Sequence, residues 1–334
     1  MKDKKAYEYL AKSGAEISST PTRAVCLVNA GNQQGIAVDD FEAACSLLGK
    51  IAYLLNFPGK TYCVVIYEGL ECAIDAHKAL AGRACTLLKR TYSKEASIPL
   101  LVEYLIEDSI QLPVPATVQD ARAVPGLVVV ENFITAEEES TLKQCLDRYK
   151  WEPLSRRRVQ HHGIRFNYST NRHADDSMPG FPQEVQDIII GKLRRMKSLN
   201  PVDEVSPVEP VPVPDQLTVN EYKPGAGISA HVDTHSPFRG AIISVSLCGR
   251  VVMEFKHRDG RAMSVLVPAR SLVAFTGEVR YDWTHAITET RFDYVDNSFR
   301  ERQFRISLTF RETKSTPCDC NYPHLCDSVG STQL

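Results

Sequence analysis

Four residues in the second half of the chain have the types and spacing of an iron site with an anchor for an acidic cosubstrate. His231 and Asp233 lie two positions apart in ISAHVDTH, His285 follows in TGEVRYDWTHAI, and Arg305 lies in RISLTFR. Two imidazoles and one carboxylate can hold a divalent iron on one face, leaving positions open for a bidentate oxo-acid and for dioxygen. A guanidinium can pair with the charge of the oxo-acid. A single His-x-Asp is common in exposed polar strands, but the complete set predicts an oxygenase.

His235 continues the alternation of His231 and Asp233 by one more step. Because side chains two positions apart point to the same side of an extended strand, we expect all three to share one face. The iron needs only one of these two histidines. The other is therefore available for a second role.

Length and composition restrict the class of protein. The chain has 334 residues, enough for two domains, and its 43% hydrophobic residues can fill their cores. No apolar run is long enough to cross a membrane and the charged N-terminus lacks a signal-peptide core, so we expect a soluble protein of the cytoplasm, with the nucleus as an alternative. The formal net charge of -2 predicts that any nucleic-acid contact is made by local patches. Ten cysteines without a secretory signal indicate reduced thiols and metal sites rather than disulfides.

The elements that precede the iron residues begin with strand and helix patterns in the order βαββαβ. Apolar runs predict the strands, whereas Phe41, Ala44 and Leu48 recur at helical spacing in the first helix and Gly82 ends the second. This order is that of a ferredoxin-like domain. Strands are expected at 24–30, 51–57, 61–67 and 98–106, and helices at 38–51 and 70–82.

The βαββαβ domain resembles the RNA-recognition motif. Lys60, Tyr62 and Tyr67 in KTYCVVIY match basic and aromatic positions of the longer signature strand, and VCLVNA lies where the shorter one belongs. The resemblance implies that Lys60 and Tyr62 contact RNA. Cys26 and Val64 replace two of the usual base-stacking aromatics, so we expect weak binding, because each stacked base contributes about 1–3 kcal/mol. The alternative is a ferredoxin-like domain used for packing or interaction.

After this domain the patterns change to short strands. Thr135 and Glu138 form a capping-box signature for one helix. The β runs of this region, separated by turn signals, predict a double-sheet jelly roll, so the whole chain is α+β. The runs are 126–133, 217–222, 241–247, 251–257, 262–268, 271–277 and 304–310. The expected organisation is a helical extension at 1–20, the RNA-recognition-motif-like domain at 21–108, a linker at 109–124, the catalytic domain at 125–316 and a zinc-binding tail at 317–334.

The catalytic region resembles the AlkB-type iron(II) and 2-oxoglutarate dioxygenases. Four elements occur in the family's order: Asn220-x-Tyr222, His231-x-Asp233, His285, and Arg305 followed by Arg311. The resemblance implies that His231, Asp233 and His285 bind Fe(II). It also implies oxidative decarboxylation of 2-oxoglutarate to succinate and carbon dioxide, with dioxygen as cosubstrate, coupled to hydroxylation of a substrate C–H bond. No side-chain nucleophile or general base is needed.

The same resemblance assigns the residues that hold the cosubstrate. Arg305 would pair with the distal carboxylate of 2-oxoglutarate, a bidentate contact that lysine does not reproduce. Asn220 and Tyr222 would share a face and hydrogen-bond its oxygens, and Arg311 would lie nearby. Ser307 stands where relatives often have asparagine, so its shorter hydroxyl would contact the cosubstrate less directly.

A second metal site is predicted at the C-terminus. Cys318, Cys320 and Cys326 form C-x-C-x5-C, and three thiolates with a fourth ligand can close a tetrahedral Zn(II) site. His235 is the preferred fourth ligand and His324 the rival. The alternative is three exposed thiols in a tail, which would be prone to oxidation.

The flanking features resemble the AlkB homologue eight branch of the family, whose members hydroxylate 5-methoxycarbonylmethyluridine at the wobble position of tRNA. The segment SRRRVQHHGIRFNY adds basic and planar groups suited to phosphates and a splayed base, although an exposed charged strand pair is an equal alternative. An anticodon loop presents its wobble base unpaired, so little unstacking energy is required. The candidate RNA contacts in this segment are Arg156, Arg157, Arg158, Arg165 and Tyr168.

Animal members of that branch carry a further methyltransferase domain. We expect none in this chain, so a separate tRNA methyltransferase would supply the ester. Two other functions remain open: an AlkB-type demethylase of alkylated nucleic acid or protein, and a catalytically silent RNA-binding protein. The oligomeric state is not predicted.

Overall fold

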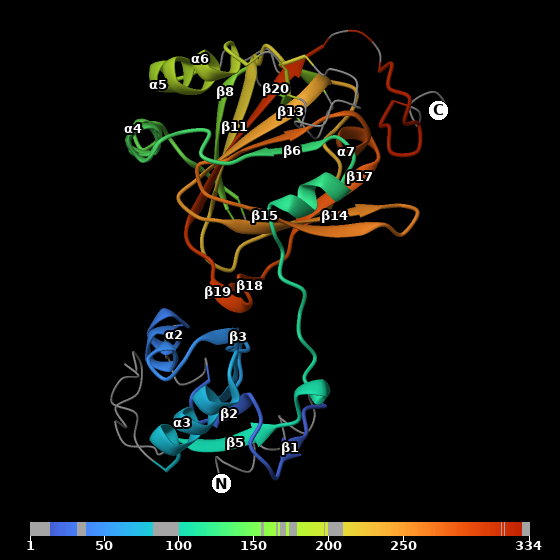
Figure 1. Ribbon diagram of the computed structural model, residues 1–334. Coiled ribbons are helices and arrows are strands. Elements are labelled where there is room, and N and C mark those ends of the chain that lie inside the picture. The colour runs from blue at the N-terminus through green and yellow to red at the C-terminus, as the bar shows by residue number, and fades with distance from the viewer. Residues whose placement is uncertain are drawn as a thin grey trace. The chain divides into compact units, whose positions relative to one another are not determined.

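The computed structural model divides the chain into two compact units. The first contains Met1–Pro115 and Phe292–Glu301, and the second contains Ala116–Arg291 and Arg302–Leu334 (Figure 1). The described residues are 14–31, 38–82, 100–154, 157–164, 166–167, 172–173, 179–196, 198–199, 210–314, 316 and 318–328. Within them, no helix is long and apolar enough to traverse a bilayer.

The first unit is built around the predicted βαββαβ order. Four antiparallel strands run in the sheet order β5-β2-β4-β3, which is the order of a ferredoxin-like domain. The strands are β2 (Ala24–Val28), β3 (Ile51–Leu55), β4 (Tyr62–Tyr67) and β5 (Leu101–Leu105), and the helices are α2 (Val38–Ser46) and α3 (Leu70–Leu80). The expected strands and helices are therefore confirmed, with α2 ending earlier than predicted.

The expected helical extension at 1–20 differs from the structure where it can be compared. Residues 1–13 lie outside the described part of the chain. Ile17–Ser18 form a short strand, β1, that pairs antiparallel with β5. Pairing with a free sheet edge supplies backbone hydrogen bonds that a helix would otherwise make internally.

The sheet of the first unit gains two strands from a distant part of the sequence. The hairpin β18 (Phe292–Val295) and β19 (Ser298–Glu301) extends it at β3, where Ser298 pairs in parallel with Leu54. The amide of Leu54 donates to the carbonyl of Asn297 at 3.0 Å. Sequence patterns did not predict that this hairpin joins the sheet, because β3 lies more than two hundred positions earlier.

Both faces of this sheet are filled with apolar side chains. One face packs against α2 and α3 through Val25, Leu27, Val65 and neighbouring residues. The opposite face forms a second cluster that includes Cys26, Tyr62 and Val64, with Tyr294 of β18 packed against it.

The second unit consists of two facing sheets, as the jelly-roll prediction requires. The larger has the order β6-β16-β13-β20-β11-β8-β7, and the smaller has the order β12-β17-β14-β15. The larger contains β6 (Leu127–Val130), β7 (Glu152–Pro153), β8 (Arg158–Gly163), β11 (Gln216–Tyr222), β13 (Phe238–Leu247), β16 (Leu272–Phe275) and β20 (Arg305–Thr313). The smaller contains β12 (Ile228–His231), β14 (Val251–His257), β15 (Ala262–Val267) and β17 (Trp283–Ile287). A short separate pair is formed by β9 (Phe166–Asn167) and β10 (Arg172–His173).

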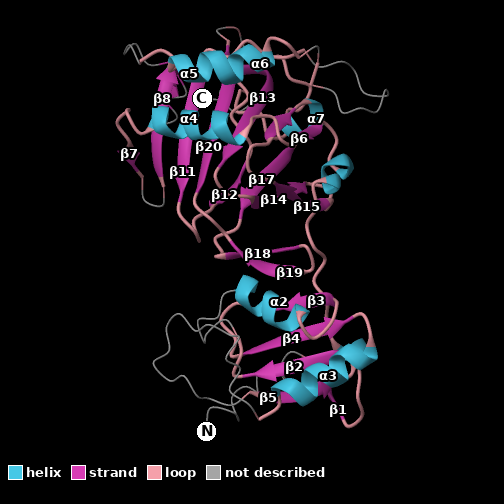
Figure 2. Ribbon diagram, turned by 60° about the vertical axis from the view of Figure 1, so that its left-hand side comes forward, coloured by secondary structure: helices cyan, strands magenta, loops and turns pink. Residues whose placement is uncertain are grey.

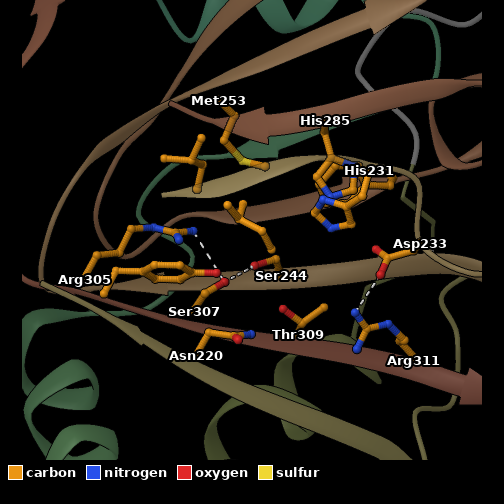
Figure 3. A pocket seen from close by; sticks show the side chains of 14 residues that line it. Asn220, His231, Asp233, Ser244, Met253, His285, Arg305, Ser307, Thr309 and Arg311 are labelled. Carbon is orange, nitrogen blue, oxygen red and sulfur yellow. Dashed lines mark hydrogen bonds and ion pairs between the residues drawn. The ribbon is translucent and has the colours of Figure 1, made fainter. Parts of the chain in front are cut away.

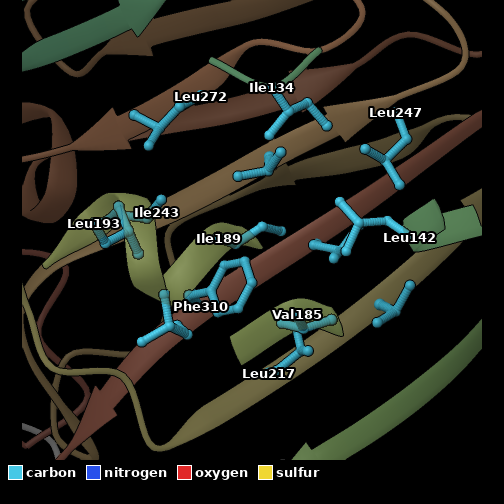
Figure 4. Close-up of a cluster of buried hydrophobic side chains, with 14 of the residues drawn as sticks. Ile134, Leu142, Val185, Ile189, Leu193, Leu217, Ile243, Leu247, Leu272 and Phe310 are labelled. Carbon is cyan, nitrogen blue, oxygen red and sulfur yellow. The ribbon is translucent and has the colours of Figure 1, made fainter. Parts of the chain in front are cut away.

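Helices cover the outer face of the larger sheet (Figure 2). They are α4 (Ala136–Leu146) and the continuous helical segment α5, η4 and α6 (Gln183–Leu193). The predicted capping box is confirmed, since Thr135 Oγ accepts from the amide of Glu138 and the Glu138 carboxylate accepts from the amide of Thr135. Leu142 and Ile189 pack with Leu217 and Phe310 of the sheet (Figure 4). This core makes the larger sheet a rigid support for its inner face.

The expected linker at 109–124 is shorter than predicted. Thr117 forms a bridge with Val265 of β15, and Ala121 and Val124 are buried in the apolar cluster between the two sheets. The second unit therefore begins before residue 125, because these small apolar side chains find a core to enter.

Candidate active site

Alternation along β11 and β20 separates a polar pocket from the apolar core. The antiparallel register pairs Asn220 with Ser307 and Tyr222 with Arg305. Directly opposed residues lie on one face of a sheet, so these four side chains share the inner face. The intervening Val219 and other apolar residues enter the core beneath the helices. The predicted common face of Asn220 and Tyr222 is thus confirmed, and Arg305 lies on it as well.

The inner face opens into a pocket of about 490 Å³, including its mouth (Figure 3). Both sheets contribute side chains, and every residue predicted for iron or cosubstrate binding lines it. The lining residues are Asn220, Tyr222, Ile228, His231, Asp233, Ser244, Met253, Phe275, His285, Ile287, Arg305, Ser307, Thr309 and Arg311.

Strands β12 and β17 of the smaller sheet, together with the residues that follow β12, bring the three expected iron ligands together. His231 at the end of β12 pairs with His285 on β17, and their ring centroids are 4.3 Å apart. Nδ1 of His231 lies 2.8 Å from the carbonyl oxygen of Ser229. When Nδ1 carries the proton and donates to that carbonyl, Nε2 is left with its lone pair for a metal. Figure 3 shows Asp233 beside the two rings.

Burial and charge prepare these ligands for a cation. Burial lowers the pKa of His285 to about 3, so its imidazole is neutral at physiological pH. Burial alone would raise the pKa of Asp233, but electrostatic interactions with Arg311, His285, Arg280 and His231 hold it well below its usual range. Arg311 donates to Oδ1 of Asp233 at 2.8 Å. A neutral imidazole and an ionised carboxylate are the forms that bind Fe(II), so the donor set fits this metal.

The other end of the pocket contains a buried cation. The guanidinium of Arg305 donates from Nε to Ser246 Oγ at 2.8 Å and lies 5.7 Å from the centre of the Tyr222 ring. Within the described residues it has no ion-pair partner, and burial lowers its pKa. A buried guanidinium is costly unless an anion compensates it. The distal carboxylate of a dicarboxylic acid would do so.

The polar side chains near Arg305 already form some hydrogen bonds with other residues of the protein. Ser307 Oγ lies 2.8 Å from Ser244 Oγ and 3.4 Å from the Arg305 guanidinium. The amide oxygen of Asn220 accepts from Nε of Arg157 at 2.9 Å. The amide nitrogen of Asn220 is then the group that can donate to a ligand.

The cysteine cluster forms as a separate site. His235, Cys318, Cys320 and Cys326 have ligand atoms that all lie within 4.8 Å of one another. Nδ1 of His235 lies 3.3 Å from Cys320 Sγ, and its Nε2 is buried without a hydrogen-bond partner. Three sulfurs and one imidazole nitrogen are a common zinc ligand set, so the residues fit Zn(II). His235, not His324, is the histidine in this group.

The shared strand face predicted for His231, Asp233 and His235 is wrong. β12 ends at His231, and the next residues are not in a strand. The chain turns at this point, so period-two alternation does not apply. Consequently Asp233 lines the pocket whereas His235 lies among the cysteines.

Two of the arginines predicted to bind RNA are bonded to β11. Arg157 contacts Asn220, and Arg158 forms a two-point ion pair with Glu221 at 2.5 and 2.6 Å. The Arg158 guanidinium also lies 4.8 Å from the centre of the Trp151 ring. These contacts attach the β7–β8 hairpin to β11, the strand that carries Asn220 and Tyr222. Arg156, Arg165 and Tyr168 lie outside the described residues.

The expectation that Tyr62 stacks on RNA does not fit the structure. Its side chain is 1% exposed, and Phe57 lies 5.8 Å from it, centroid to centroid. Cys26 and Val64 beside it are buried as well. The ring has no open face for a base, because the cluster that contains Tyr294 fills this side of the sheet. Lys60 is partly exposed.

Sequence reasoning missed several residues of the pocket and its surroundings. Ser244 and Ser246 are hydroxyls within the apolar run AIISVSL, and their parity on β13 was the available signal. Met253 and Thr309 line the pocket without any signature. Arg280 was also missed, although a charged residue between the apolar Val279 and Trp283 is unusual.

Comparison with known proteins agrees with the geometry of the pocket. The model of the 2OG-Fe(II) oxygenase superfamily matches residues 126–311. The tRNA (carboxymethyluridine(34)-5-O)-methyltransferase alkbh8 of Xenopus tropicalis is 33% identical over 351 residues, covering 98% of this chain and 52% of the relative. The alkylated DNA repair protein ALKBH8 homolog of Arabidopsis thaliana is 31% identical over 341 residues, covering 95% of each. The DNA N6-methyl adenine demethylase of Caenorhabditis elegans is 29% identical over 191 residues, covering 57% of this chain and 60% of the relative.

The fold, the pocket and these matches define the class. The chain belongs to the 2OG-Fe(II) oxygenase superfamily and is a 2-oxoglutarate-dependent dioxygenase. Within that class it is an AlkB-type dioxygenase close to ALKBH8. The chain spans about half the length of the animal relatives that it matches.

Proposed function

We propose that this dioxygenase hydroxylates 5-methoxycarbonylmethyluridine at the wobble position of tRNA. The observation that carries the proposal is the pocket in which His231, Asp233 and His285 lie at one end and Arg305 at the other. The substrate class is supported by similarity to relatives over nearly the whole chain, one of which is named for its action on carboxymethyluridine 34 of tRNA.

The chain's own residues would bind and orient the reactants. Arg305, Asn220 and Tyr222 would hold 2-oxoglutarate, and the iron ligands would leave one face of the metal open. Bound Fe(II) supplies the activation of dioxygen that organic side chains do not provide. Met253, Phe275 and Ile287 line the same pocket and would limit the access of water.

The proposed substrate requires an earlier reaction. Its methyl ester must be formed by a methyltransferase acting on carboxymethyluridine before the methylene carbon is hydroxylated. We therefore propose tRNA as the macromolecular partner and a tRNA methyltransferase as the enzyme that supplies the substrate. The Xenopus relative carries such an activity in its name, and this chain matches 52% of that relative.

A demethylase of alkylated nucleic acid or protein is the second candidate. It would use every iron and cosubstrate residue of the pocket. The Arabidopsis relative is named for repair of alkylated DNA, and the Caenorhabditis relative for demethylation of adenine. The latter match covers 57% of this chain, whereas the match to the Xenopus relative covers 98%. This difference disfavours the adenine reaction. The match to the Arabidopsis relative covers 95% of this chain, so the reaction products must separate hydroxylation of the uridine from repair. A catalytically silent RNA-binding protein receives no support from the complete ligand set.

The two reactions leave different products. The purified chain is incubated with Fe(II), 2-oxoglutarate, oxygen and tRNA that contains the methoxycarbonylmethyl base, and the nucleosides are analysed by mass spectrometry. Gain of one oxygen atom on that base is the expected result. Formaldehyde release from methylated nucleic acid, with the uridine unchanged, would contradict the proposal. The His231→Ala variant is the control for metal-dependent turnover.

We further infer that His235, Cys318, Cys320 and Cys326 bind Zn(II) as a structural site. Four protein ligands close the coordination shell, which is typical of structural rather than catalytic zinc. Elemental analysis of the purified chain should find one zinc per molecule, and Cys320→Ser should lose it. A wild-type chain that holds no zinc after purification in zinc-containing medium would refute the site.

A further inference from the structure

One buried arginine lies between the two metal sites. Arg280, on α7 (Gly277–Tyr281), is 2% exposed. Its NH1 donates to the carbonyl of Asp233 at 2.7 Å, and its NH2 donates to the carbonyl of Thr234 at 2.9 Å. Across the part of the chain that the structure describes, it has no ion-pair partner. Neither the pocket nor the cysteine cluster includes Arg280 among its own residues.

The two carbonyls belong to the segment that connects the sites. β12 ends at His231, so the backbone of Asp233 and Thr234 has no strand partner to hold it. The planar guanidinium presents two donors in a fixed geometry and binds two successive carbonyls at once. This contact fixes the turn that directs Asp233 to the pocket and His235 to the cysteines. A lysine in the same place would supply the charge without the paired geometry.

Aromatic packing continues the contact from Arg280 to the cysteine cluster. Its guanidinium lies 4.6 Å from the centre of the Tyr281 ring. That ring meets His235 edge-on at 5.0 Å and stacks on Tyr322 at 5.6 Å, centroid to centroid. Tyr322 lies between Cys320 and Cys326 in the sequence. A chain of direct contacts therefore links the cysteine segment to the arginine that holds Asp233.

Metal in the cysteine cluster would also change the electrostatic environment of the Arg280 guanidinium. A divalent zinc with three thiolates and a neutral imidazole carries one net negative charge. A buried cation without a carboxylate partner is stabilised by such a charge nearby. Loss of the zinc would leave the guanidinium with less compensation.

We propose that Arg280 is a positioning residue that couples the cysteine metal site to the iron site. Metal at the cysteines fixes His235, Tyr281 and Tyr322, and Arg280 in turn fixes the backbone of the iron ligand Asp233. This inference rests on the proposed zinc site. Because coupling between two binding equilibria is reciprocal, iron at the pocket would strengthen zinc retention by the same factor.

The test is a double-mutant cycle on the full chain with Cys320→Ser and Arg280→Met. Fe(II) is titrated anaerobically in the presence of 2-oxoglutarate, and binding is followed by the charge-transfer absorption of the complex. Cys320→Ser should weaken Fe(II) binding at least about 5-fold in the wild-type background but less than about 2-fold in the Arg280→Met background. Arg239→Met is the matched control, because Arg239 is exposed, pairs with Glu312 and belongs to neither the pocket nor the cysteine cluster.

Equal effects of Cys320→Ser in the two backgrounds would overturn the coupling. Thermal melting and zinc content of Arg280→Met are measured in parallel, since a merely structural arginine would lower stability without changing the cycle. If Arg280→Met does not fold, Arg280→Lys replaces it, and full coupling in that variant would refute the requirement for the paired donors. A wild-type chain without zinc refutes the cysteine site itself, whereas a zinc-loaded chain with equal effects refutes only the coupling. Neither result depends on the nucleoside substrate.

Discussion

The two units of this molecule use one face of a sheet in opposite ways. In the first unit the face that carries Cys26, Tyr62 and Val64 is filled by an apolar cluster. In the second unit the inner face of β11 and β20 carries Asn220 and Arg305 around a pocket. A buried polar face without internal compensation requires a ligand, whereas a filled apolar face has no free surface to offer one. The polar pocket that can bind reactants therefore lies in the second unit. The corresponding sheet face of the first unit is filled by side chains and leaves no exposed surface on which RNA bases could stack.

The largest expected effect is loss of an iron ligand. Asp233→Ala removes the anionic ligand, and succinate formation should fall more than the roughly 10–100-fold that loss of an outer-shell partner causes. His324→Ala is the control, because His324 belongs to neither metal-binding group within the described residues. Retention of wild-type succinate formation by Asp233→Ala would break the assignment of the polar face to catalysis.

The buried cation at the other end should act mainly on cosubstrate binding. Arg305→Gln removes a charge-assisted contact of about 1.5–3 kcal/mol, which corresponds to a rise of about 10–150-fold in KM for 2-oxoglutarate. The readout is succinate production at varied 2-oxoglutarate concentration. Arg239→Gln, at an exposed ion pair on the same sheet, should leave this KM unchanged. An unchanged KM in Arg305→Gln would place the cosubstrate elsewhere.

Arg157 and Arg158 are adjacent, but Arg157 contacts Asn220 whereas Arg158 contacts Glu221 of β11. Arg157→Met should raise KM for 2-oxoglutarate about 2–10-fold, because it releases the amide oxygen of Asn220 from a hydrogen bond of about 0.5–1.5 kcal/mol. Arg158→Met should leave KM unchanged and lower the melting temperature, since Glu221 remains buried without its partner. Equal KM values in the two variants would show that Arg157 does not act through Asn220.

The smallest expected effect is on RNA binding through the first unit's sheet. Tyr62→Leu should change the tRNA dissociation constant less than about 2-fold, whereas loss of a stacked base would weaken it about 5–150-fold. The variant is expected to melt at a lower temperature, because the phenol ring is part of a packed cluster. Filter binding at fixed ionic strength measures the affinity. A large loss of affinity at unchanged stability would restore the RNA role of this face.

Local patterns predicted most of the elements and failed where distant segments meet. The capping box of α4 and the strand around Arg305 depend on neighbours a few positions away, and they were predicted correctly. The hairpin β18–β19 depends on pairing with β3, and no local signal specifies that partner. The backbone after His231 is likewise held from a distance, because Arg280 donates hydrogen bonds to the carbonyls of Asp233 and Thr234.

By itself, the sequence determined the donor set. The identity and spacing of His231, Asp233, His285 and Arg305 fix which atoms can bind iron and a dicarboxylate, because ligand chemistry belongs to side-chain type. Only the tertiary structure decided how each side chain is used. It placed His235 among the cysteines rather than at the iron site and buried Tyr62 in the apolar cluster against which Tyr294 packs. Orientation and exposure depend on packing between segments far apart in the chain, which no local pattern contains.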